Sequence, residues 1–180
     1  MDTKTIIKII SASRTKEYYI TQRKDFKIET ILDSADASVA FSVPDQVYPI
    51  TCESYVVVEH QEYIVKEISP VKNGYRDVKA ILNLEDLEGK LFSTYEKKAT
   101  AEAHLEEALK DTGWKLRCQL DDNTELTIED ENTTAKAIID QVREIFGIEV
   151  RYDTQSKVLY AARQIGDDEG VVFQIGRAHV

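Results

Sequence analysis

The spacing of apolar residues changes once along this chain, near residue 97. Before that point apolar and polar residues alternate, as they do over 38–43, and alternation is typical of half-buried strands. After it, apolar residues recur every three or four positions, as over 135–146, and this spacing predicts amphipathic helices. The chain is therefore predicted to be an α+β protein, with a β-barrel-like domain over residues 1–97 and a small α+β domain over residues 98–174.

The first part of the chain is predicted to consist of short strands. The clearest pair is a hairpin whose strands are joined by His60-Gln61, although this turn lacks the Asn-Gly or Gly-Gly pair that such hairpins favour. A turn at Lys72-Asn73-Gly74 precedes the last of these strands. The regular spacing of short strands is typical of a barrel or a sandwich. The predicted strands cover residues 5–10, 24–32, 38–43, 53–59, 62–68 and 75–82.

The second part is predicted to contain two helices, each followed directly by a strand. Thr100 is the expected N-cap of the first helix and Gly113 its expected stop. For the second helix the cap is Thr133 or Asn132, and Gly147 is the stop. Two helix–glycine–strand units in succession indicate a small α+β module. The strands are expected at residues 114–118, 148–152 and 157–162.

The charge of the chain argues against one class of function. The net charge is -10 and the isoelectric point about 4.9, so the surface repels phosphate backbones. No cluster of lysine and arginine with interleaved aromatics offsets this, and specific nucleic-acid binding is not expected. The longest apolar run, residues 158–162, is far shorter than the roughly 20 residues of a membrane-spanning helix, so no span is expected.

The two cysteines, Cys52 and Cys118, lie far apart in the sequence and outside any CxxC spacing. We interpret them as two buried thiols of a chain that folds in a reducing compartment. A disulfide between them is the alternative.

No residues are predicted to be catalytic, to bind a cofactor or to ligate a metal. The three histidines have unpromising settings: His60 lies in the predicted hairpin turn, His104 beside the apolar stripe of an acidic helix, and His179 near the end of the chain. No zinc-binding, nucleophile-elbow or phosphate-loop motif occurs. No cofactor is therefore expected.

Acidic and aromatic residues offer weaker candidates. Clustered carboxylates could ligate calcium, but the EF-hand spacing is missing, so solvated loops, turns and helix N-terminal charge are the better interpretation. Trp114 is interpreted as a core residue, with an exposed sugar-binding platform as the alternative. The acidic runs are residues 121–125, 129–132 and 166–170.

The order of several segments resembles the N-terminal region of phage tail hub proteins. These form the minor tail or tail-associated endopeptidase family of siphophages and of prophages in Gram-positive hosts. The likeness covers most of residues 5–174, and the order of the segments carries it. The matching segments are 39–44, 62–68, 105–114, 135–147 and 170–173.

The resemblance also bears on the end of the chain. In that family the Gly-Val-Val-Phe segment is followed by a glycine turn, and the chain continues. Here residues 175–180, Ile-Gly-Arg-Ala-His-Val, follow instead, and a common sequencing adapter translated in frame reads the same. We expect residues 175–180 to be a non-native tail and the chain to be truncated at its C-terminus.

The resemblance implies a structural component of a tail tip or baseplate hub, a homotrimeric ring that joins the tail tube to the host-facing end. It implies contacts with other tail proteins, namely the distal tail and tape measure proteins. It also implies a place in the virion tail after assembly in the host cytoplasm. Any peptidase domain would lie beyond this fragment, so the fragment is not expected to be an enzyme. The alternatives are a cell-wall hydrolase (endopeptidase) and a carbohydrate-binding module.

Overall fold

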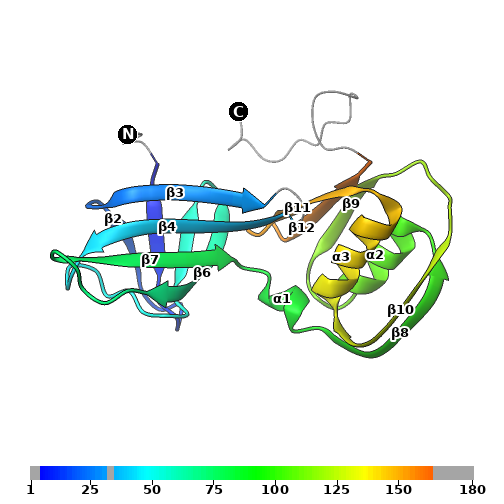
Figure 1. Cartoon of the computed structure of the whole chain (residues 1–180), viewed down its shortest axis with the longest axis horizontal. Coiled ribbons are helices and arrows are strands. Elements are labelled where there is room, and N and C mark those ends of the chain that lie inside the picture. Colours follow the sequence, from blue (N-terminus) through cyan, green and yellow to red (C-terminus); the bar gives the residue numbers. More distant parts are fainter. Residues whose placement is uncertain (1–4, 32–34, 164–180) are drawn as a thin grey trace. The chain divides into compact units, whose positions relative to one another are not determined.

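The computed structural model describes residues 5–31 and 35–163, which form two compact units that divide between Asn83 and Leu84 (Figure 1). This division lies before the domain boundary expected at residue 97. Strand β8 (Leu91–Ala99) spans that expected boundary, and it pairs along its length with β10 (Leu126–Thr134) of the second unit. The strand expected at 170–174 and the expected non-native tail lie outside the described residues.

The first unit is one antiparallel sheet of seven strands. All six strands predicted for this part are confirmed, and the short strand β2 is an addition. Neighbouring strands follow the order β2-β1-β5-β6-β7-β4-β3. The strands are β1 (Ile7–Ile10), β2 (Glu17–Ile20), β3 (Lys24–Ile31), β4 (Asp36–Pro44), β5 (Tyr55–Val58), β6 (Gln61–Ile68) and β7 (Tyr75–Leu82).

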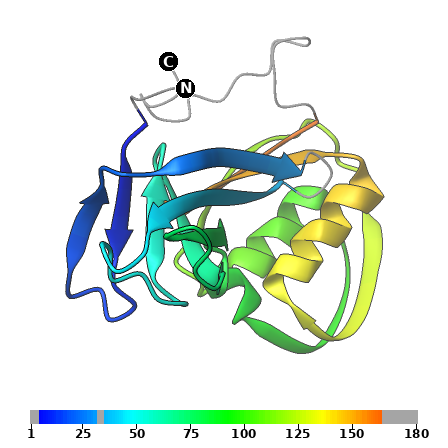
Figure 2. The ribbon, with the colours of Figure 1, turned by 60° about the vertical axis from the view of Figure 1, so that its left-hand side comes forward.

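This sheet is curled but open, because its end strands β2 and β3 do not pair with each other (Figure 2). The register shifts between Lys24 and Lys27 in β3, and again between Val65 and Glu67 in β6. Such irregularities bend a strand and increase its twist. The sequence-based expectation of a β-rich unit is confirmed, in the form of a curled sheet. Its alternating apolar side chains form the core, including Ile7, Ile9, Val39, Phe41, Val43, Val56, Val65, Val78 and Ala80.

The β5–β6 hairpin turns one residue earlier than predicted. Val58 pairs with Gln61, so the two turn residues are Glu59 and His60, with φ angles of 48° and 65°. Positive φ at both central residues defines a type I′ turn, whose twist matches that of the flanking strands. The turn before β7 is confirmed, and there the positive φ angles fall on Asn73-Gly74.

The second unit combines helices with two small sheets (Figure 1). Strands β8 and β10 form a two-stranded ribbon, and β12 lies between β11 and β9, parallel to β9. Helix α2 packs against α3 and contacts β8 and β9, whereas α3 also contacts β10 and α1. The other elements are α1 (Glu85–Glu88), α2 (Ala101–Leu109), β9 (Lys115–Gln119), α3 (Ala135–Phe146), β11 (Glu149–Asp153) and β12 (Val158–Ala162).

The interpretation of residues 129–132 as a solvated loop is wrong, because they lie within β10. Ile128 is buried on the inner face of the ribbon, while Glu129 and Glu131 are exposed on the outer one. Glu129, Asp130 and Glu131 are held in the strand by backbone pairing with β8, so the strand needs few apolar residues.

Both major helices begin at a threonine cap. The Thr100 hydroxyl accepts a hydrogen bond from the Ala103 N–H at 3.2 Å, which confirms the predicted cap of α2. In α3 the cap is Thr134, whose hydroxyl accepts from the Ala137 N–H at 3.1 Å, rather than Thr133 or Asn132. Thr133 is buried instead.

The helix ends follow the prediction in one case of two. Gly147 ends α3 in the left-handed region, with a φ of 63°, as predicted. Helix α2 ends at Leu109, before Gly113, which lies in the following turn. The Lys90 ammonium closes this end by donating to the carbonyl oxygens of Glu107 and Lys110 at 2.7 and 2.6 Å.

Within the described residues, the helices are too short or too polar for any of them to cross a bilayer.

Candidate functional site

His104 lies in the core of the second unit, where both of its ring nitrogens have partners. Nε2 is 2.9 Å from the Leu126 carbonyl oxygen and Nδ1 is 2.8 Å from the Tyr95 hydroxyl. A carbonyl oxygen only accepts, so Nε2 donates to it, and Nδ1 accepts from the Tyr95 hydroxyl. Burial raises the pKa of Tyr95 to about 12, so that hydroxyl keeps its proton. The ring thus joins α2 to both strands of the ribbon and has no nitrogen left for catalysis.

The two cysteines differ in exposure. Cys52 is exposed in the turn before β5, so the interpretation of two buried thiols is wrong for this residue. Its Sγ lies 3.6 Å from the carbonyl oxygen of Lys66. Cys118 is half-buried on β9, and burial raises the pKa of its thiol to about 11. Both thiols are free. A thiol that remains protonated at neutral pH is a poor nucleophile, so Cys118 is unsuited to covalent catalysis.

Trp114 is a core residue, as the sequence predicts. It is only 6% exposed, and its ring meets that of Tyr152 edge to face with the centroids 5.9 Å apart. A ring packed in this way presents no face to a sugar.

The acidic run at 121–125 is held by local hydrogen bonds. The Asp122 carboxylate accepts from the side chain and the backbone N–H of Thr124, and these bonds lower the pKa of Asp122. Over residues 5–31 and 35–163, no three His, Cys, Asp or Glu side chains gather in a way that could hold a metal ion. The run at 166–170 and His179 lie outside the described residues, and His60 is exposed at the tip of its hairpin.

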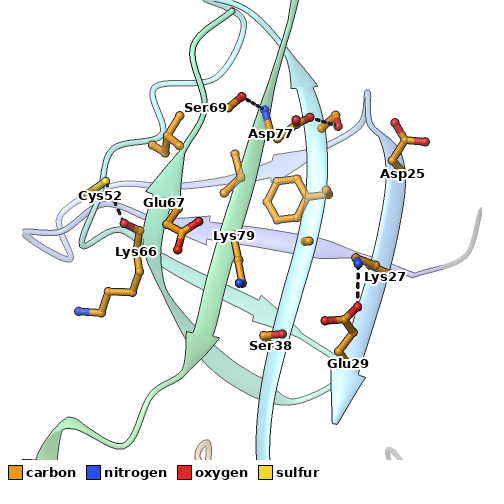
Figure 3. A pocket seen from close by; sticks show the side chains of 15 residues that line it. Asp25, Lys27, Glu29, Ser38, Cys52, Lys66, Glu67, Ser69, Asp77 and Lys79 are labelled. Atoms are coloured by element: carbon orange, nitrogen blue, oxygen red, sulfur yellow. Dashed lines mark hydrogen bonds and ion pairs between the residues drawn. The ribbon is translucent and has the colours of Figure 1, made fainter. Parts of the chain in front are cut away.

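A groove of about 860 Å³ lies on one side of the first unit, over strands β3, β4, β6 and β7 (Figure 3). We call this side the groove face. Ser38, Ala40 and Ser42 of β4 line its middle. The register places Lys27, Ala40, Lys79 and Glu67 in one row across the four strands. The charged residues that line the groove are Asp25, Lys27, Glu29, Lys66, Glu67, Asp77 and Lys79.

Several of these charged groups have partners within the groove. Lys27 donates to Glu29 at 2.7 Å and lowers the pKa of that carboxyl. The Ser42 hydroxyl donates to Asp77 at 2.6 Å. Among the described residues, Lys79 and Glu67 make no ion pair within 4.0 Å, although they are cross-strand neighbours. The groove is thus lined by four acids and three lysines, in near balance.

Sequence reasoning did not find this groove. A signal was present in the polar residues that alternate with the core positions, such as Lys27 and Glu29 on β3 and Asp77 and Lys79 on β7. Only the strand order and register show that these residues share one face.

Residues 93–165 match the family model described as the prophage endopeptidase tail domain. The match begins within β8 and extends past β12, so it covers most of the second unit. This match supports a phage tail domain in this segment. No curated protein matches the sequence.

Solved structures of prophage tail proteins share the fold over most of this chain. The tail protein gp18 from Listeria monocytogenes EGD-e matches with a TM-score of 0.74 and 20% identity, over 87% of this chain and 50% of that one. The 43 kDa tail protein of prophage MuSo2 from Shewanella oneidensis has a TM-score of 0.60 and 14% identity, over 93% and 58%. A tail protein from Neisseria meningitidis MC58 has a TM-score of 0.56 and 13% identity, over 87% and 50%.

The resemblance to phage tail proteins, expected from the sequence, is therefore confirmed by the family-model match and by the fold. These matches support a structural role in a phage tail. The chain spans about half the length of the solved tail proteins that it matches.

Proposed function

We propose that this chain is part of a phage or prophage tail-tip hub, which joins the tail tube to the host-facing end of the baseplate. The observation that carries the proposal is the match of residues 93–165 to the prophage endopeptidase tail domain. The fold shared with prophage tail proteins over most of the chain supports it. In such a hub the curled sheet of the first unit would contribute to a barrel-like wall.

The proposal includes the assembly expected from the sequence: a homotrimer in contact with the distal tail and tape measure proteins. The subunit would be assembled in the host cytoplasm and carried in the virion tail. The negative charge of the chain supports a role without specific nucleic-acid binding.

We propose that this chain is not itself an enzyme. The family description includes an endopeptidase, so a peptidase could reside in another part of the natural protein. In this chain, His104 has both ring nitrogens occupied in the core, and burial raises the pKa of the Cys118 thiol to about 11, so that it stays protonated at neutral pH. These observations weigh against the hydrolase alternative, and the buried Trp114 weighs against the carbohydrate-binding module.

The test is to tag the natural gene in its phage or lysogen, purify the particles and locate the tag by immunogold electron microscopy. We expect label at the tail tip and, after deletion of the gene, heads without complete tails. Normal tails from the deletion strain, or virions free of the tagged protein, would overturn the proposal.

A further inference from the structure

The floor of the groove is made of small side chains. Ser38, Ala40 and Ser42 are the alternate residues of β4 that face it, with charged side chains of β3 on one side and of β7 and β6 on the other (Figure 3). From the first of these residues to the last, the strand advances about 13 Å, at roughly 3.3 Å per residue. Such a floor lets the backbone of another chain approach β4 closely, and about five extended residues would fill its length.

Four cations around the groove are each engaged within the chain. Lys27 donates to Glu29 at 2.7 Å. The other three contacts are those of Lys24 with the Tyr75 ring, Lys66 with Glu53, and Arg76 with Asp45. These contacts direct the four cations to groups other than Asp25, Glu67 and Asp77.

The latter three carboxylates keep an uncompensated charge. Asp25, Glu67 and Asp77 are exposed, and over residues 5–31 and 35–163 none of them makes an ion pair within 4.0 Å. Asp77 accepts from the Ser42 hydroxyl at 2.6 Å, but that partner is neutral. Lys79 lies beside Glu67 and supplies one positive charge against three negative ones. The charge that the groove offers to a partner is therefore negative.

The spacing of these carboxylates favours a cationic side chain over a metal ion. Asp25 and Asp77 lie on β3 and β7 with β4 between them, so their backbones are roughly 10 Å apart, twice the strand spacing. Within the described part of the chain, no three His, Cys, Asp or Glu side chains gather closely enough to hold a metal ion. A guanidinium or ammonium group on a flexible side chain can contact carboxylates on either side of β4.

We propose that the groove binds an extended, basic segment of another protein. The backbone of this segment lies along β4, and its lysine or arginine side chains contact Asp25, Glu67 and Asp77. The net charge of -10 adds a long-range attraction for such a segment and disfavours an acidic one. Ile81, which is 39% exposed on the groove face, provides an apolar contact at the other end of the groove. The inference goes beyond the proposed function and does not depend on it.

The test measures the binding of five-residue peptides with blocked ends to the full chain by isothermal titration calorimetry. The probes are Arg-Ala-Arg-Ala-Arg, Gln-Ala-Gln-Ala-Gln and Glu-Ala-Glu-Ala-Glu. We expect the arginine peptide to bind one per chain and at least about tenfold more tightly than the glutamine peptide. Its affinity should fall when NaCl is raised from 50 to 300 mM. The glutamate peptide should bind most weakly of the three.

Substitutions in the groove locate the binding. Asp25→Asn with Asp77→Asn removes two charges, while asparagine tolerates the positive φ at the first position and can still accept from Ser42 at the second. We expect this double variant to raise the dissociation constant of the arginine peptide at least about tenfold. Lys79→Gln should lower the dissociation constant, because it removes a repelling cation. Ala40→Leu should raise it without a charge change, because leucine fills the floor.

A matched control is Glu129→Gln with Glu131→Gln on the exposed face of the ribbon in the second unit. It changes the net charge as much as the groove double variant does, and we expect its dissociation constant to stay within about twofold of wild type. Thermal unfolding of each variant verifies that it is folded.

An arginine peptide that binds no more tightly than the glutamine peptide would overturn this inference, as would a groove double variant that binds like wild type. A ribbon control that binds as weakly as the groove double variant would also overturn it, because the peptide would then respond to net charge alone. None of these results bears on whether the protein is found in tails, which the labelling experiment measures separately.

Discussion

The imidazole of His104 joins three elements of the second unit through two hydrogen bonds. Its removal in His104→Phe leaves the Tyr95 hydroxyl and the Leu126 carbonyl without these partners. We expect the free energy of unfolding to fall by about 2–4 kcal/mol, measured by urea denaturation at pH 7. Tyr95→Phe removes one bond only and should cost about 1–2 kcal/mol.

The exposed His60 provides the control for this experiment. We expect His60→Asn to change the free energy of unfolding by no more than about 0.5 kcal/mol, because asparagine tolerates the positive φ at this position. A similar small change for His104→Phe would show that the buried network contributes nothing to stability.

The two thiols should differ in reactivity. Cys118 is half-buried and its pKa is raised to about 11, whereas Cys52 is exposed. At pH 8 we expect Cys52 to react with a chromogenic disulfide at least about ten times faster than Cys118, because the thiolate is the reactive form. The Cys52→Ser variant isolates the slow reaction. Equal rates for the two wild-type thiols would contradict the raised pKa and the partial burial of Cys118.

At the scale of elements, the β5–β6 hairpin is strained at its turn. Glu59 and His60 both have positive φ, a conformation that costs residues with a Cβ roughly 1–2 kcal/mol each. Replacing them by Asn-Gly, the pair that favours this turn, should raise the free energy of unfolding by about 1 kcal/mol. Chemical denaturation measures the change.

The second hairpin turn provides the reverse substitution. Asn73-Gly74 already has positive φ at both residues. Changing this pair to Glu-His should lower the free energy of unfolding by a similar amount. If both substitutions changed the free energy of unfolding in the same direction, turn conformation would not be the cause of the changes.

The ribbon contains a repulsive pair. Glu96 lies directly opposite Glu129 on its exposed face, and like charges in this position destabilise a sheet. We expect Glu129→Lys to raise the free energy of unfolding by about 0.2–1 kcal/mol, with a smaller gain in 1 M NaCl. Thr127→Lys, which places a lysine opposite Lys98, should have the opposite effect. An increase in the free energy of unfolding that does not depend on salt would point to a cause other than charge.

Elements with a strong apolar pattern could be predicted from the sequence, and those without one could not. Strand β4 and helix α3 bury regular apolar positions, and both were predicted. Strand β10 buries only Ile128 and Thr133, so periodicity could not separate it from a loop. The groove required the register of four strands, which no local pattern contains. The α3 cap falls on one of two adjacent threonines, and only the backbone conformation decides between them.

At the scale of the whole molecule, hydroxyl and thiol groups that are buried or half-buried in the two units retain their protons to a higher pH than they would in the unfolded chain. Burial raises the pKa of Tyr63 in the first unit and of Tyr95 in the second from 10.0 to about 12, and that of Cys118 from 9.0 to about 11. Because each folded-state pKa is higher than the unfolded one, each group stabilises the fold below its unfolded pKa. That stabilisation is lost as the pH rises through the folded value.

We therefore expect the free energy of unfolding to fall between pH 9 and about 12, measured by urea denaturation at a series of pH values. Cys118→Ala should remove the part of the decline that begins near pH 9, and Tyr63→Phe should reduce the part above pH 10. Stability that stays constant up to pH 11.5 would contradict this account.

Strand β12 completes one sheet of the second unit, and it is the last strand of that sheet to be synthesised. All five of its side chains are buried, and it pairs in parallel with β9, which lies before β10, α3 and β11 in the chain. Such distant pairing forms late, because the long intervening segment must first be brought into place. On the ribosome, β9 and β11 therefore lack their shared neighbour until Ala162 has been translated and has emerged from the ribosome. A growing chain that stalls before this point exposes an unfinished sheet, which makes translation pauses in this stretch a source of aggregation.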